Sequence, residues 1–245
     1  MELIAVCPPE YTAEAASRGF SVAHACYTVD KNGLCILKGA EPRGGIMLIS
    51  GEGELALDEK LRSQIADECA VRRFSGVFFD MPIKTYTAVE SIVGSGLSLY
   101  LPNSFHEGAV AVVSSAISGG SFEAHLRHAL KLRPASGLAL GLELTRMDFT
   151  LPEKSGRGRE LSRDELKSLF DKNRGRSFFS EELCAFYFRY AADGKNHMVL
   201  FDNERSVSRK LAIAEKLGFE KAFFYYPELR SMGSVINYRD ARPRE

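Results

Sequence analysis

Short runs of β-branched and aromatic residues recur along the chain, and Gly, Pro or Asn bounds most of them. Runs of this length and composition are typical of strands buried on both faces of a parallel sheet. We predict eight such strands, at residues 3–7, 21–29, 45–50, 76–80, 97–101, 109–114, 137–144 and 221–226.

Amphipathic stretches separate many of these runs. Their apolar residues recur at i,i+3 or i,i+4 spacing, which is the pattern of a helix with one buried face. The stripes are Leu61, Ile65 and Cys69; Val89, Ile92 and Val93; Phe122, Leu126 and Leu130; and Val207, Leu211 and Ala214. Ser121, Asp202 and Asn203 are candidate N-caps, and Gly218 is a candidate stop. Strands that alternate with helices predict βαβ units and a parallel sheet.

The alternation is interrupted once, between residues 151 and 202. Ser162 and Glu165 form a capping-box pattern that predicts a helix, and Asp193-Gly194 predicts a hairpin between two strands. We therefore expect a small α+β insertion at 151–202, between the seventh and eighth strands. The whole chain, 1–245, is predicted to be a single α/β domain, a (β/α)8 TIM barrel, which typically occupies about 250 residues.

The C-terminal third carries the most specific pattern. An acidic hairpin turn at Asp193, the segment from Asp202 to Ser206, Lys210 on the next helix, and the strand 221–226 follow one another. This order and spacing resemble those of glycoside hydrolase family 18, the chitinase-like barrels. The loop Ser50-Gly51-Glu52-Gly53 also stands where that family has a Ser-x-Gly-Gly turn.

The resemblance implies a defined motif on the fourth strand, DxxDxDxE. Here Ser75 replaces the first Asp, Phe78 the second and Pro82 the Glu, and only Asp80 is retained. Family members hydrolyse glycans with assistance from the N-acetyl group of the substrate, while the terminal Glu donates a proton to the leaving oxygen. Proline has no proton to donate, and general acid catalysis typically contributes 10²–10⁴-fold.

The resemblance therefore implies a barrel that has lost glycosidase activity. It would act as a saccharide-binding protein for an N-acetylhexosamine glycan, or as a scaffold that binds a protein partner. The alternative is an active hydrolase of N-acetylhexosamine glycans with a relocated acid, Glu143 or Glu107. Glu52, Glu107, Glu143 and Asp148 are also open to a second interpretation, as polar loop residues or partners of Arg146 or Lys84.

Four residues are candidates for substrate binding: Asp80, Asn103, His106 and Tyr226. Asp80 ends a predicted barrel strand, where barrel active sites form, although its carboxylate could equally cap a loop amide. Asn103 and His106 follow the fifth strand and could form hydrogen bonds to a sugar. The chain has no Trp, so Tyr226 is the substitute for the Trp with which the eighth strand of the family usually ends.

Charge and composition exclude other classes of function. Lys plus Arg and Asp plus Glu balance at 32 each, which favours neither nucleic acid nor an anionic membrane as partner. The five cysteines are scattered, which suits a reducing, cytoplasmic location. We expect no signal peptide, membrane span or cofactor. We also expect no metal site, because His125 and His128 lack a third ligand. The oligomeric state is left open.

Overall fold

The computed structural model describes residues 1–84, 96–152, 158–173 and 176–236. The chain divides into two compact units. The first comprises Met1–Ser114, Ala129–Gly141 and Gly218–Ser231, and the second comprises Ser115–His128, Leu142–Leu217 and Met232–Glu245. The predicted insertion at 151–202 falls inside the second unit. Within the described ranges, no helix is both long enough and apolar enough to cross a lipid bilayer.

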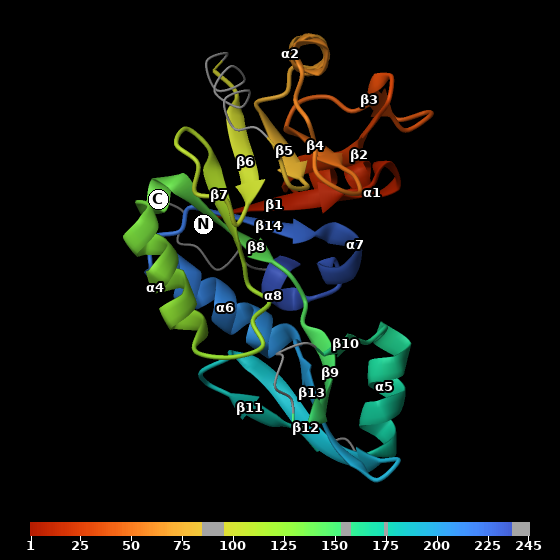
Figure 1. The fold of residues 1–245 in the computed structure, drawn as a ribbon, viewed down its shortest axis with the longest axis vertical. Helices are drawn as coiled ribbons and strands as arrows, with labels where there is room; N and C mark the ends of the chain where they lie inside the picture. Colours follow the sequence, from red (N-terminus) through yellow and green to blue (C-terminus); the bar gives the residue numbers. More distant parts are fainter. Residues whose placement is uncertain (85–95, 153–157, 174–175, 237–245) are drawn as a thin grey trace. The chain divides into compact units, whose positions relative to one another are not determined.

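Parallel strands of the first unit form a closed barrel (Figure 1). They are β1 (Glu2–Cys7), β2 (Ser21–Asp30), β4 (Ile46–Ser50), β5 (Gly76–Asp80), β6 (Ser98–Pro102), β7 (Val110–Ser114), β8 (Leu138–Leu142) and β14 (Lys221–Tyr225). They follow one another in the order β1-β14-β8-β7-β6-β5-β4-β2, and pairing of β1 with β2 closes the ring. The predicted α/β fold class, a TIM barrel, is confirmed, and each predicted strand is present.

One short strand of the first unit lies outside the parallel ring. β3 (Gly33–Ile36) pairs antiparallel with the last residues of β2, from Tyr27 to Asp30. The two strands form a hairpin that extends past the point where β1 ends, because β1 pairs with β2 only as far as Cys7 and His24. The sequence pattern did not predict this strand, which is only four residues long.

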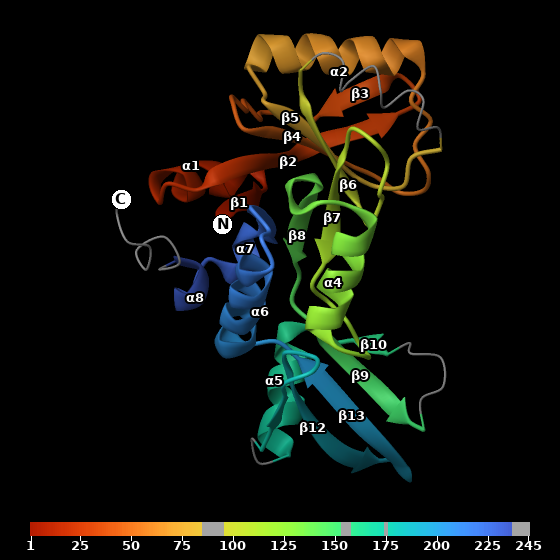
Figure 2. The same cartoon turned by 90° about the vertical axis from the view of Figure 1, so that its left-hand side faces the viewer.

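The best-defined helix of the first unit has the buried residues that the sequence predicts and a side-chain cap at its start. α2 (Glu59–Arg72) buries Leu61, Ile65 and Cys69, as predicted, and the Asp58 carboxylate caps it by accepting a hydrogen bond from the backbone N–H of Leu61. Figure 2 shows α2 running alongside β3. α1 (Pro9–Ser17), the 3₁₀ turn η1 (Ala135–Gly137) and α7 (Tyr226–Leu229) are the other described helices that lie wholly in this unit. The predicted stripe of Val89, Ile92 and Val93 lies outside the described residues.

The second unit contains an antiparallel sheet with the order β10-β9-β13-β12-β11. Its strands are β9 (Arg146–Leu151), β10 (Arg159–Glu160), β11 (Phe178–Ser180), β12 (Ala185–Ala192) and β13 (Lys195–Phe201). β9 begins at Arg146, whereas the α+β insertion was predicted to begin at residue 151. The sequence pattern did not separate β9 from β8, because only residues 143–145 lie between the two strands.

The helix and the hairpin predicted within 151–202 are both present. α5 (Arg163–Lys172) begins with a capping box between Ser162 and Glu165, and its apolar side covers one face of the sheet. Asp193 and Gly194 both have positive φ angles and join β12 to β13 as a two-residue turn. Left-handed conformations at both positions define the turn type that matches the twist of a hairpin.

The other helices with residues in the second unit are α4 (Phe122–Leu132), α6 (Glu204–Lys216) and α8 (Gly233–Ile236). The Ser121 hydroxyl accepts a hydrogen bond from the backbone N–H of Ala124, which makes it the predicted cap of α4. Asn203 caps α6 through a reciprocal pair of hydrogen bonds with Ser206, and the predicted stripe of Val207, Leu211 and Ala214 is buried. The helix predictions in this part of the chain are confirmed.

Candidate functional site

The barrel interior is filled by apolar side chains from every strand of the ring. Because side chains alternate along a strand, these residues define the inward series of each strand. They are Ile4, Ala23, Ile46, Leu48, Phe78, Tyr100, Val112, Ala139 and Phe223, and they form one buried cluster. Tyr100 and Phe223 meet edge to face, and Phe78 contacts both. The interior is therefore a packed core, and any site must lie above it, at the strand ends.

The inward series continues into a layer at the carboxyl ends of the strands, which we call the mouth. In the first unit the next inward positions are Val6, Ala25, Ser50, Asp80, Pro102, Ser114, Gly141 and Tyr225. Most of these residues are small or uncharged. Asp80 is the carboxyl-bearing residue among them, and it pairs in register with Ser50 of β4.

Asp80 has no hydrogen bond or ion pair to any other described residue of the chain. It keeps contact with solvent at the mouth, yet burial of its carboxyl raises the pKa above the ordinary Asp value. Burial removes part of the hydration of the carboxylate, and no cation among the described residues offsets this effect on the pKa. A carboxylate in this condition is ready to accept hydrogen bonds from a ligand, because such bonds replace the hydration that it has lost.

The segment after Asp80 is fixed by its backbone. The carbonyl of Pro82 accepts a hydrogen bond from the backbone N–H of Leu55 at 2.7 Å, and the N–H of Lys84 donates to the carbonyl of Leu55 at 2.9 Å. Leu55 and Ile83 form a parallel bridge. The exposed ring of Pro82 is thus held two residues beyond Asp80, where the family 18 motif carries its acid, and it offers no ionisable group.

Asn103 and His106 lie at different places in the β6–β7 loop. Asn103 directly follows β6, is exposed, and has a positive φ of 46°. Its side-chain oxygen lies 3.4 Å from the backbone N–H of Ser114, at the carboxyl end of β7. Asn103 is therefore beside the mouth, as the sequence predicts, but its side-chain oxygen is directed to the backbone of β7.

His106 is at the other end of β7. Its carbonyl and that of Ala109, the residue before β7, both accept hydrogen bonds from the Arg133 guanidinium. Arg133 itself precedes η1 and the start of β8. The Nδ1 of His106 also pairs with the carbonyl of Glu107 at 2.7 Å. His106 therefore lies near the amino-terminal end of β7, because the short loop returns along the barrel before β7 begins. The structure does not bring it together with Asp80.

Tyr226 is buried outside the barrel ring. It is 0% exposed, packs against Tyr11 and Phe20, and donates a hydrogen bond from its hydroxyl to Glu14 at 3.1 Å. Its neighbour Tyr225 has the parity of Phe223, pairs in register with Val6, and is 44% exposed. The aromatic side chain at the mouth is therefore Tyr225. The prediction missed it by one residue, and the alternation from Phe223 could have identified it.

The candidate relocated acids of the second unit lie in different surroundings. Glu143 directly follows β8 and is exposed, and its backbone N–H and carbonyl both bond to the Ser115 hydroxyl. Asp148 of β9 is only 8% exposed and accepts hydrogen bonds from Tyr190 at 2.7 Å and His197 at 3.1 Å. The partners of Asp148 are thus His197 of the adjacent strand β13 and Tyr190 of β12, the next strand in the sheet. Sequence spacing could not reveal this cluster, because 42 and 49 residues separate Asp148 from Tyr190 and His197.

Two of the remaining sequence candidates lie on the surface. Glu52 and Glu107 are both exposed.

Among the described residues, no group of three or more His, Cys, Asp or Glu side chains is arranged to hold a metal ion.

Comparison with known proteins gives a clear result for the fold alone. No family model matches the sequence, and no curated protein is significantly similar to it. Solved structures are similar in fold. A chitinase from Chromobacterium violaceum has a TM-score of 0.65 and 15% identity over 99% of both chains. The Bacillus cereus spore cortex-lytic enzyme SleL has a TM-score of 0.64 and 16% identity over 91% of this chain and 70% of its own.

A third structure is a mutant of a plant class V chitinase from Cycas revoluta, solved in complex with (GlcNAc)3. It has a TM-score of 0.63 and 14% identity over 96% of this chain and 98% of its own. The fold is that of the family 18 chitinases. At these identities the likeness concerns the fold, and function depends on the residues that the barrel carries at its mouth.

Proposed function

We propose that this protein binds an oligosaccharide of N-acetylhexosamines at the mouth and does not hydrolyse it. The observation that carries the proposal is the pair of residues at the end of β5. Asp80 presents a carboxyl that has no hydrogen bond or ion pair within the described part of the chain, and Pro82 occupies the position from which a family 18 hydrolase would protonate the leaving group.

The binding half of the proposal rests on two complementary groups. The Asp80 carboxylate can accept a hydrogen bond from the amide N–H of an N-acetyl group, a charge-assisted bond that is stronger than a neutral one. Tyr225 offers a partly exposed ring at the mouth, and aromatic faces pack on the apolar faces of pyranose rings. The Cycas revoluta chitinase mutant, which shares the fold, was solved with (GlcNAc)3, and this supports the choice of ligand.

The loss of hydrolysis follows from the missing proton donor. A glycosidic oxygen is a poor leaving group at neutral pH unless an acid protonates it in the transition state. Asp80 cannot fill both roles, because in the substrate-assisted scheme that the resemblance implies it orients the N-acetyl group. Pro82 has neither a side-chain proton nor a backbone N–H.

The test is a binding and turnover measurement on the full chain with GlcNAc oligomers of three to six units. We expect calorimetric binding without release of shorter oligomers over a day, and a loss of binding in Asp80→Asn. Asp67→Asn, on the exposed side of α2, is the matched control and should bind like the wild type. Rapid hydrolysis by the wild type, or the absence of binding at millimolar oligomer, contradicts the proposal.

Restoring the acid tests the chemistry directly. Pro82→Glu keeps the backbone carbonyl that bonds to Leu55 and adds a carboxyl two residues beyond Asp80. We expect this variant to release shorter oligomers from an unmodified GlcNAc oligomer, whose sugar alkoxide leaves only when it is protonated, and Pro82→Gln to release none. Equal product release by the two variants contradicts the argument about the missing acid.

The alternative function is hydrolysis with Glu143 as the acid. Glu143 continues the alternate positions of β8 after Ala139 and Gly141, and its side chain is exposed. This alternative predicts slow turnover in the wild type that Glu143→Gln abolishes, with binding unchanged. The proposed function predicts no turnover in either protein.

A further inference from the structure

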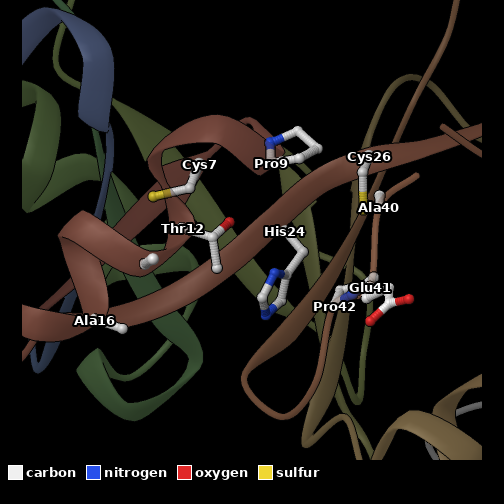
Figure 3. Close-up of a pocket in the computed structure, with 10 residues that line it drawn as sticks. Cys7, Pro9, Thr12, Ala16, His24, Cys26, Ala40, Glu41 and Pro42 are labelled. Atoms are coloured by element: carbon white, nitrogen blue, oxygen red, sulfur yellow. The ribbon is translucent and has the colours of Figure 1, made fainter. Parts of the chain in front are cut away.

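A cavity lies outside the barrel ring, between α1 and the outer face of β2. Its volume is about 270 Å³, and Figure 3 shows the residues that line it. We call it the α1 pocket; its main lining residues are Thr12, Ala13 and Ala16 of α1, His24 and Cys26 of β2, and the loop 40–42. All of these residues belong to the first unit.

The α1 pocket exists because the connection from β2 to β4 lacks a helix. In a regular (β/α)8 barrel, a helix covers the outer face between successive strands. Here residues 31–45 contain the short strand β3 and then a loop that leads to β4. The loop covers less of β2 than a helix would. On the other side of the pocket, α1 presents a stripe of small side chains at Ala13 and Ala16.

Backbone contacts fix both ends of this loop against β2 and α2. At its start, the N–H of Leu37 donates to the carbonyl of Cys26 at 2.9 Å. At its end, Gly45 lies so close to β2 that a Cβ there would be 2.2 Å from the Val22 carbonyl oxygen. The N–H of Gly44 donates to the carbonyl of Arg72 at 2.9 Å. Both ends of the loop that borders the α1 pocket are therefore fixed by backbone contacts.

His24 supplies the polar recognition group. Its side chain is only 4% exposed, and its Nε2 lies 3.1 Å from the carbonyl oxygen of Gly44. A carbonyl only accepts, so Nε2 must carry the proton. Burial lowers the pKa of His24 by more than its backbone hydrogen bonds with Gly44 and Arg43 raise it. The ring is therefore neutral, and Nδ1, which carries no proton, is a hydrogen-bond acceptor. No described residue of the chain donates to it. Figure 3 shows the ring between the α1 side chains and the loop 40–42.

The size and chemistry of the α1 pocket define one class of ligand. A dry cavity of about 150 Å³ holds benzene, so 270 Å³ accommodates a single or fused aromatic ring system. Ala13, Ala16 and the thiol of Cys26 favour an apolar body, and Nδ1 of His24 requires a donor. We propose that the α1 pocket binds a compact neutral aromatic molecule with one N–H or O–H donor, of about the size of indole or phenol.

This site is independent of the proposed glycan site. The pocket opens beside Ala13 and Ala16, which are exposed residues of α1, on the outside of the barrel wall. The mouth residues Asp80 and Tyr225 belong to the inward series of β5 and β14. A ligand in the α1 pocket would therefore leave glycan binding unchanged, and each proposal can fail without the other.

The test compares two probes and two variants of the full chain. Indole has the N–H donor, and indene has nearly the same shape without it. By calorimetry and thermal denaturation we expect indole to bind the wild type about tenfold more tightly than indene, because one hydrogen bond to a buried acceptor is worth about that much. A site built around a buried acceptor rejects the analogue that lacks the donor.

Ala16→Leu fills the pocket from α1, and Ala70→Leu adds the same side chain to the exposed side of α2. We expect indole to raise the Tm of the wild type and of Ala70→Leu in a concentration-dependent way, and to leave the Tm of Ala16→Leu unchanged. If indole changes the Tm of Ala16→Leu and Ala70→Leu equally, indole does not bind in the α1 pocket. Equal affinity for indole and indene overturns the role of His24, and no shift of the wild-type Tm at saturating indole overturns the site.

Discussion

The ammonium nitrogen of Lys210 lies 2.7 Å from Oδ2 of Asp202, and both side chains are almost completely buried. The same carboxylate oxygen accepts a hydrogen bond from the backbone N–H of Thr145 at 2.9 Å, and the carbonyl of Thr145 accepts one from the N–H of Asp202. The cluster joins α6 to the residues that precede β9, within the second unit. A buried charge is tolerated only with such a partner.

Removing the Lys210 charge should therefore destabilise the protein strongly. Lys210→Met leaves the Asp202 carboxylate buried without a cation, and we expect the free energy of unfolding to fall by about 3–5 kcal/mol. The control is Lys167→Met, which breaks an exposed pair with Asp171 of equal length, 2.7 Å, and should cost less than about 1 kcal/mol. Urea denaturation measures both. Similar losses in the two variants contradict the role of burial.

Asp80 should make stability depend on pH in a defined direction. Its raised pKa in the folded state means that the folded protein holds this proton more tightly than the unfolded chain. Stability is then lost as the pH rises from the ordinary Asp value of about 3.9 through the raised pKa. We expect Asp80→Asn to be more stable than the wild type at pH 7, and the difference to disappear as the pH falls to about 4.

The measurement for Asp80 is urea denaturation at a series of pH values, with Asp67→Asn as the control. Asp67 is exposed on α2, so its replacement should leave the pH dependence unchanged. A stability gain for Asp80→Asn that is independent of pH contradicts the explanation by desolvation. A gain in stability together with lost glycan binding would mark Asp80 as a residue retained for function at a cost to the fold.

The adjacent residues Tyr225 and Tyr226 should respond in opposite ways. Tyr226→Phe removes the hydrogen bond to Glu14 and should lower the free energy of unfolding by about 1 kcal/mol, without any change in glycan affinity. Tyr225→Ala should leave stability nearly unchanged and weaken glycan binding. Calorimetry and thermal denaturation on both variants distinguish the two roles. Weakened glycan binding in Tyr226→Phe would contradict the assignment of the mouth to Tyr225.

The loop beside the α1 pocket allows a comparison between two glycines. Gly39 and Gly45 both have left-handed backbones, with φ of 83° and 67°. An alanine at either position costs about 1–2 kcal/mol in this conformation. A Cβ at Gly39 meets nothing within 4 Å, whereas one at Gly45 would be 2.2 Å from a backbone carbonyl oxygen. Gly45→Ala should therefore cost clearly more than Gly39→Ala in urea denaturation, and equal costs contradict the close approach.

Local patterns were enough to predict most elements. The strands of the barrel, the capping box at Ser162 and Glu165, and the Asp193-Gly194 hairpin are encoded within a few consecutive residues. Strands buried on both faces, helix caps and left-handed turns each require particular residue types at particular positions, so the local sequence predicts them. β3 was missed because four residues are too few for a pattern, and β9 was missed because only residues 143–145 separate it from β8.

The sequence by itself determined the class of fold, the position of Asp80 at the end of a strand, and the absence of a carboxyl at Pro82. Only the tertiary structure decided which side chains meet. In the structure, Tyr225 rather than Tyr226 lies at the mouth. His106 lies near the amino-terminal end of β7, and Asp148 forms a hydrogen bond with His197. These outcomes depend on strand register and on the path of loops, which are set by contacts between residues far apart in the chain. The short-range pattern of apolar and polar residues does not predict such long-range contacts.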